Sequence, residues 1–197
     1  PLPTPSEIVS SRLEKLDGQL LQVIDALTDE EASVWPATTA PSCKWHLWHM
    51  ARWADYVQSL LSSVVDEKSP ELWEFDGVAD EWGFEGVDLG MWGAGSGLGN
   101  EKGASLPLPG VPKVKTYAKE VFELLEKRID KLDEHTFNAA FTDWHANETN
   151  VGDAMVGYIA HATRHLTSTP VHLPALLHLS PAHPTAHPCL CRVPVAR

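Results

Sequence analysis

Two histidines four residues apart carry the strongest chemical signal in the sequence. His161 and His165 fall in an apolar stretch that we expect to be helical, and residues at i and i+4 lie one above the other on a single helix face. Two imidazoles at this spacing can converge on one metal ion, as they do in HExxH metalloenzymes. The glutamate of that motif is absent here, so the pair is also compatible with two surface histidines.

The residues around the pair favour a buried site. Apolar residues place this helix in the core: Val156, Ile159 and Leu166. Small residues beside the pair leave room for a ligand or a neighbouring helix: Ala154 and Gly157, with Tyr158 one turn before His161. Buried neutral histidines are unfavourable unless their ring nitrogens find partners. A metal ion would satisfy them.

A third ligand has to come from another helix. An aromatic segment further upstream contains His49, with His46 one turn earlier, and either one could instead be a core or rim histidine. Three imidazoles with one open coordination position are typical of catalytic rather than structural zinc sites.

Four segments have the apolar periodicity of helices. We expect helices at about Ser6–Leu27, with Ser6 as the N-cap, then at Ser42–Val65 and Lys113–Leu132, and from Thr149 or Asn150 to Ser168. The stretch Asp66–Pro112 lacks this pattern, and its length suits a long crossover in a helical bundle. The prediction is an all-α four-helix bundle, residues 1–169, with the crossover between helices two and three.

The crossover carries three tryptophans, Trp73, Trp82 and Trp92, which we expect to cover the bundle or the mouth of a pocket. Its glycine-rich run from Gly93 to Gly99 has neither the spacing of a dinucleotide fingerprint nor that of a P-loop. Nucleotide binding is therefore not predicted.

Beyond residue 169 the composition changes. Residues 170–197 are rich in proline and histidine and contain Cys189 and Cys191, so we expect an extended or disordered tail. Such a tail can bind metal weakly, but its spacing matches no zinc motif.

Charge and cysteine content limit the remaining classes. The formal net charge is −12, with 27 acidic and 15 basic residues, which disfavours nucleic acid and anionic membrane surfaces as partners. We see no apolar run of about 18 residues and no leader, and three cysteines cannot form a disulfide framework. A cytoplasmic location is expected.

Two segments resemble signatures of the DinB-like superfamily. Ser42–Asp55 resembles its second-helix signature, in which a Trp- or Leu-rich stretch ends in a metal-binding His followed by Ala-Arg and an acidic residue. His161–Leu166 resembles its HxxxH signature. The resemblance implies His49, His161 and His165 as ligands and leaves His46 at the rim. Asp55 matches the acidic position, but its distance of six residues from His49 argues against a direct ligand.

The resemblance also implies a function. Characterised relatives are thiol-dependent transferases or isomerases that use mycothiol, bacillithiol or glutathione; others have no known activity, and dimers are frequent. We therefore expect a metal-dependent thiol S-transferase or isomerase acting on a small molecule, with a homodimer as one expectation. Zinc is the first candidate ion, and nickel, iron or copper are alternatives. The expected substrate pocket contains Trp45, Trp48, Arg52 and Tyr158. A metal-activated water, and a non-catalytic metal-binding or interaction bundle, remain open.

Overall fold

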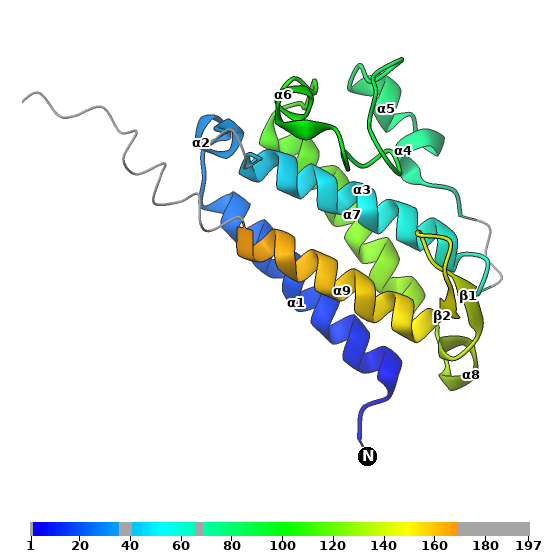
Figure 1. Cartoon of the computed structure of the whole chain (residues 1–197). Helices are drawn as coiled ribbons and strands as arrows, with labels where there is room; N and C mark the ends of the chain where they lie inside the picture. Colours follow the sequence, from blue (N-terminus) through cyan, green and yellow to red (C-terminus); the bar gives the residue numbers. More distant parts are fainter. Residues whose placement is uncertain (1, 36–40, 66–68, 169–197) are drawn as a thin grey trace, which may run out of the picture.

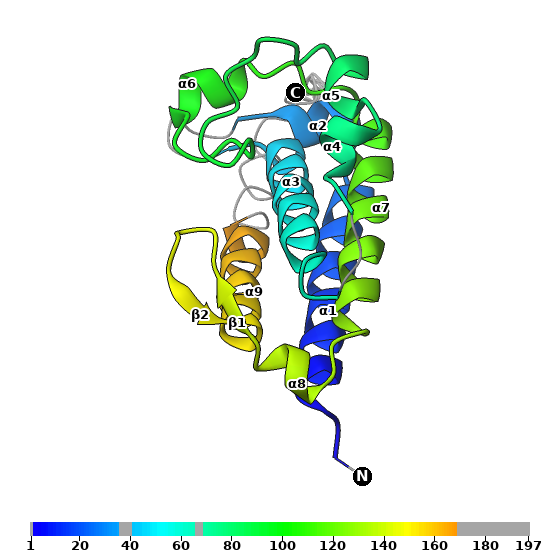
Figure 2. The same cartoon turned by 90° about the vertical axis from the view of Figure 1, so that its right-hand side faces the viewer.

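The computed structural model describes residues 2–35, 41–65 and 69–168. Four long helices lie side by side (Figures 1 and 2): α1 (Pro5–Asp25), α3 (Cys43–Leu61), α7 (Val111–Ile129) and α9 (Val151–Ser168). The described part is mainly helical, consistent with the predicted all-α class. The predicted tail, residues 170–197, lies outside the described residues.

Short elements connect these helices. They are α2 (Asp29–Ser33), α4 (Leu72–Phe75), α5 (Val78–Glu81), α6 (Gly99–Ala104) and α8 (Glu134–Phe137). The segment before α9 contains α8 and an antiparallel hairpin of β1 (Ala140–Thr142) and β2 (Glu148–Asn150), in which Phe141 pairs with Thr149.

Local chemistry explains the helix ends that differ from the prediction. The N-cap of α1 is Thr4, not Ser6, because Thr4 and Glu7 form a capping box: the Thr4 backbone N–H donates to Glu7 Oε2 at 2.7 Å. Helix α7 begins at Val111, with Pro112 in its first turn. Proline is tolerated there because backbone N–H groups of the first turn have no acceptor within the helix, so the missing N–H costs nothing. Helix α3 ends at Leu61, before the predicted Val65, and Ser62 and Ser63 donate hydroxyl hydrogen bonds to carbonyls of its last turn.

Helix α3 is the central element of the core. Fifteen of its nineteen residues are buried, which is expected of a helix that is covered on all sides. It packs most extensively on α7 and also contacts α1 and α9. Hydrogen bonds join Asp55 to Tyr117 and Gln58 to Arg128, so residue numbers increase together and the two helices run in the same direction.

The segment between α3 and α7 returns the chain to the end at which α3 begins. Its elements α4, α5 and α6 lie outside the four long helices, along one side of α3 (Figures 1 and 2). Trp73 and Trp82 are buried, with ring centroids 5.5 Å apart, and the half-buried Trp92 lies 5.1 Å from the Trp53 ring. The tryptophans therefore cover the helices, as the sequence predicted.

Within the described residues, no helix is both long enough and apolar enough to cross a bilayer.

Candidate metal centre

Three histidines from two helices meet at one point. His49 lies on α3, and His161 and His165 lie one turn apart on α9. One ring nitrogen of each lies within 4.8 Å of the other two, and the Nε2 atoms of His49 and His161 are 3.3 Å apart. Ligand nitrogens of a tetrahedral ion at about 2.0–2.1 Å lie roughly 3.4 Å from one another. The cluster is therefore close to the size that a divalent ion requires and could hold one.

Burial keeps these imidazoles neutral. It lowers the pKa of His49 to about 3, an effect that the Ala94 carbonyl opposes and that His161 and His46 increase. Burial lowers the pKa of His161 to about 4, and the charge of Arg164 adds to this shift. Burial lowers the pKa of His165 to about 2; among its neighbours His49 adds most to the shift, and Arg164 also contributes. At neutral pH each ring therefore has an unprotonated nitrogen, which is the form that binds metal.

The crossover orients the first of these rings. Nδ1 of His49 lies 2.5 Å from the carbonyl oxygen of Ala94. A carbonyl can only accept, so Nδ1 carries the proton and the lone pair of Nε2 faces His161. Arg52 supports this loop by donating from Nε to the carbonyl of Gly93 at 3.0 Å. The sequence pattern gave no indication of the Ala94 contact, because Ala94 contributes only a backbone atom.

His46 orients another ring. It was expected at the rim, but the structure corrects this: His46 is only 3% exposed, and its Nδ1 lies 2.9 Å from Nδ1 of His165. The reason is that α3 is covered on all sides, so a residue three positions before His49 also faces α9. When Nδ1 of His165 donates in this contact, the lone pair of its Nε2 can bind an ion.

The three histidines lie at one wall of a cavity of about 320 Å³. Trp45 lines this cavity and stacks on His49 with ring centroids 4.6 Å apart and planes 12° apart. Trp35, Gly95 of the glycine-rich run and Gly103 of α6 form other parts of the lining. The arrangement can hold a small molecule next to a metal ion.

The comparisons identify the family. A family model for the DinB superfamily matches residues 12–168, which include all three histidines. The chain belongs to the DinB superfamily. A crystal structure of a conserved protein from Enterococcus faecalis is similar in fold, with a TM-score of 0.72, 18% identity and coverage of 88% of this chain and 97% of that chain. No curated protein matches the chain.

Three residues expected in the pocket of this DinB-superfamily chain lie elsewhere. Among the described residues that line the cavity, Trp48, Arg52 and Tyr158 are absent. Trp48 is fully buried, and its ring stacks on Phe84 of the crossover with ring centroids 6.0 Å apart. Arg52 is buried in ion pairs, and Tyr158 is fully buried in the core. Of the four, only Trp45 lines the cavity.

Asp55, whose role the sequence left open, joins the crossover to the long helices. Its buried carboxylate accepts hydrogen bonds from the backbone of Leu72 and Trp73, both at 2.9 Å, and from the Tyr117 hydroxyl at 2.7 Å. Arg52 pairs with it at 3.2 Å and with Glu71 at 2.7 Å. The acidic position of the superfamily signature is therefore structural in this chain and is not a metal ligand.

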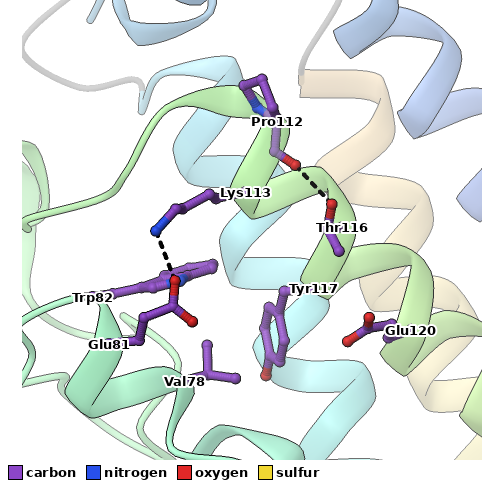
Figure 3. Close-up of a pocket in the computed structure, with 8 residues that line it drawn as sticks. All are labelled: Val78, Glu81, Trp82, Pro112, Lys113, Thr116, Tyr117 and Glu120. Carbon is purple, nitrogen blue, oxygen red and sulfur yellow. Dashed lines mark hydrogen bonds and ion pairs between the residues drawn. The ribbon is translucent and has the colours of Figure 1, made fainter.

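Two other cavities differ chemically from the histidine cavity. One, of about 350 Å³, lies between α5 and α7, with Trp82 and Tyr117 in its wall and Lys113 paired to Glu81 at 2.7 Å (Figure 3). None of the three histidines lines it. A second, of about 250 Å³, lies between the hairpin and α9 and reaches the other side of His161, beside Arg164. Of these three cavities between described residues, the 320 Å³ cavity is the one lined by all three histidines.

Proposed function

We propose that this DinB-superfamily chain is a metal-dependent enzyme that binds one divalent ion through His49, His161 and His165. The observation that carries the proposal is the convergence of three neutral imidazoles at the wall of a cavity. The donor set fits a zinc ion with one open position, and nickel, iron and copper are alternatives for the same nitrogen ligands. The arrangement of the four long helices supports a four-helix bundle with a crossover, which supplies the two rigid helices that hold the ligands.

The proposed reaction is transfer or isomerisation that uses a low-molecular-weight thiol. When bound, a divalent ion supplies Lewis-acid chemistry that stabilises a deprotonated thiol or water near neutral pH. Ala94 and His46 fix the orientation of His49 and His165, and Trp45 provides an aromatic wall for the electrophilic substrate. The thiol rests on the superfamily resemblance, and the cytoplasmic location and the homodimer remain predictions.

Metal content tests the binding half of the proposal. Purified, untagged protein is expected to contain one divalent ion per chain by elemental analysis. The double substitution His161→Ala and His165→Ala should abolish it, whereas His135→Ala, an exposed histidine on α8, should not. Truncation after Thr169 should retain the ion. If truncation removes it while the double substitution keeps it, the tail is the metal site and the proposal is wrong.

Turnover tests the catalytic half. The zinc-loaded protein should accelerate loss of free thiol when cysteine-based thiols are offered with electrophiles, and the double variant should not. A hydrolase would act on esters or amides without thiol. A chain that holds metal tightly yet accelerates neither reaction would be the non-catalytic binding module.

A further inference from the structure

His161 is held differently from the other two candidate ligands. His49 and His165 are each contacted at Nδ1, by the Ala94 carbonyl and by His46. The Nε2 atom of His161 faces His49 at 3.3 Å, but its Nδ1 has no hydrogen-bond partner among the described residues. Within this part of the chain, the orientation of the His161 ring therefore depends on packing.

The ring that packs against His161 is that of Trp53, which lies one turn after His49 on α3. The centroids of the Trp53 and His161 rings are 5.0 Å apart, and their planes are tilted by 54°. Trp53 is buried, and its ring centroid also lies 6.4 Å from that of His49. Aromatic rings at such distances pack in defined tilted or edge-to-face arrangements. A fixed Trp53 ring thus limits the orientations open to His161.

Two further tryptophans hold Trp53 in place. Trp92 of the crossover lies 5.1 Å from the Trp53 ring centroid, and Trp144 of the hairpin lies 5.7 Å from it. Nε1 of Trp92 donates a hydrogen bond to the carbonyl oxygen of Trp144 at 2.8 Å, across 52 positions of the chain. This bond joins the crossover to the hairpin directly over Trp53.

The backbone at Trp92 shows that its position is imposed by these contacts. Its φ of +57° lies in the left-handed region, which a bulky side chain rarely adopts and which persists only where the surroundings impose it. The next two carbonyls also contact α3: that of Gly93 accepts from Arg52 Nε at 3.0 Å, and that of Ala94 contacts His49. Three consecutive residues of the crossover are thus fixed against α3.

We propose that Trp53 is the positioning residue of His161 and that the hydrogen bond from Trp92 to the hairpin holds Trp53 in place. The inference rests on the proposed function, because it takes His161 to be a metal ligand. Trp53 is not among the described residues that line the 320 Å³ cavity, so it acts through His161 rather than on a bound molecule. Residues 92–94 then position ligands on both helices, His49 directly and His161 through Trp53.

Zinc affinity, measured by competition with a chromophoric chelator, tests the role of Trp53. Trp53→Leu, which removes the ring, should weaken zinc binding about 10–100-fold, the usual effect of losing a residue that orients a ligand. Trp53→Phe, which keeps a ring, should recover part of this loss. Trp82→Phe is the matched control: Trp82 is buried under the crossover against Tyr117, outside the cavity lined by the histidines, and its substitution should not change zinc binding. Zinc binding by folded Trp53→Leu equal to that of the natural sequence overturns the proposal.

Trp92→Phe tests the hydrogen bond while leaving the Trp53 ring in the protein. It should weaken zinc binding about twofold to tenfold, the range of one net hydrogen bond. NMR of the chelator-treated full chain gives a second readout, because the ring current of Trp53 shifts the ring protons of His161. Trp92→Phe should move these resonances, whereas Trp82→Phe should leave them in place.

Unchanged His161 resonances, or moved resonances with unchanged zinc affinity, overturn the role assigned to the Trp92 hydrogen bond. If Trp53→Leu does not fold by circular dichroism, Trp92→Phe decides the inference by both readouts. The resonances are measured without metal, so they can refute the packing of Trp53 on His161 while the chain still binds zinc. Failure of the natural chain to bind zinc would instead refute the proposed function and leave the resonances to report on this packing.

Discussion

Nδ1 of His46 and Nδ1 of His165 lie 2.9 Å apart, although 119 residues separate them in the chain. The contact orients the ring of His165, and with its Nδ1 as the donor it leaves Nε2 as the nitrogen that can bind an ion. Together with the contact between the Ala94 carbonyl and His49, it orients one ligand histidine on α3 and one on α9.

Removal of the His46 side chain tests this support. We expect His46→Ala to weaken zinc binding about 10–100-fold, the usual effect of losing a residue that orients a ligand. Competition with a chromophoric chelator measures the affinity, and circular dichroism monitors the helices. His46→Asn, which places an amide near the position of Nδ1, should recover part of the loss, and the exposed control His135→Ala should bind as the natural sequence does. An unchanged affinity in His46→Ala would show that the contact does not orient His165.

Asp55→Ala should destabilise the protein strongly. The substitution removes the acceptor for two backbone N–H groups of the crossover and leaves Arg52 with one fewer carboxylate in a buried position. Loss of one partner from a buried ion pair costs about 3–5 kcal/mol. Urea unfolding should show this loss, whereas Asp88→Asn, in an exposed pair with Lys102, should cost less than about 1 kcal/mol. Similar effects of the two substitutions would contradict the structural role of Asp55.

Gly95→Ala should be more harmful than Gly99→Ala. Both glycines have positive φ, +87° and +73°, so both substitutions incur the backbone cost of about 1–2 kcal/mol that a residue with a Cβ has in this region. Only at Gly95 would the added Cβ collide with the core, 2.8 Å from Trp48 Cζ3 and 2.9 Å from Trp45 Cζ2; at Gly99 nothing lies within 4 Å. We expect an additional loss of about 1–3 kcal/mol for Gly95→Ala in urea unfolding. Equal losses would mean that the loop moves away from the tryptophans at little cost.

The stability of metal-free protein should fall as the pH decreases below about 6.5. The folded-state pKa values of His49, His161 and His165 are lowered from 6.5 to about 3, 4 and 2, so below pH 6.5 the unfolded chain binds protons that the folded chain does not. Stability from this cause is complete above pH 6.5 and is lost on acidification, by roughly 1 kcal/mol per histidine per pH unit.

Urea titrations between pH 7.5 and 4.5 measure this slope. Other groups also titrate in the range, so the informative quantity is the difference from the variant with His161→Ala and His165→Ala. That variant lacks two of the three histidines and should have the shallower pH dependence. Parallel curves for the two proteins would indicate that these histidines have the same pKa in the folded and the unfolded chain.

The sequence by itself determined the features that arise within a single helix. The pitch of an α-helix alone brings His161 and His165 to one face, and apolar periodicity located the four long helices to within a few residues. The superfamily signatures then selected His49 as the third ligand, and the structure brings all three together. The helix ends were less accurate, because a capping box or a run of serines decides them locally.

Only the tertiary structure decided what surrounds these residues. Two contacts orient the ligands: Ala94 with His49, which are 45 residues apart in the chain, and His46 with His165, which are 119 residues apart. No local sequence period encodes contacts over such separations. The same is true of Asp55, whose partners in the crossover and on α7 exist only once α3 is covered on all sides. Packing of the crossover also separated Trp45, which lines the cavity, from Trp48, whose fully buried ring stacks on Phe84, although the two side chains lie on one side of α3.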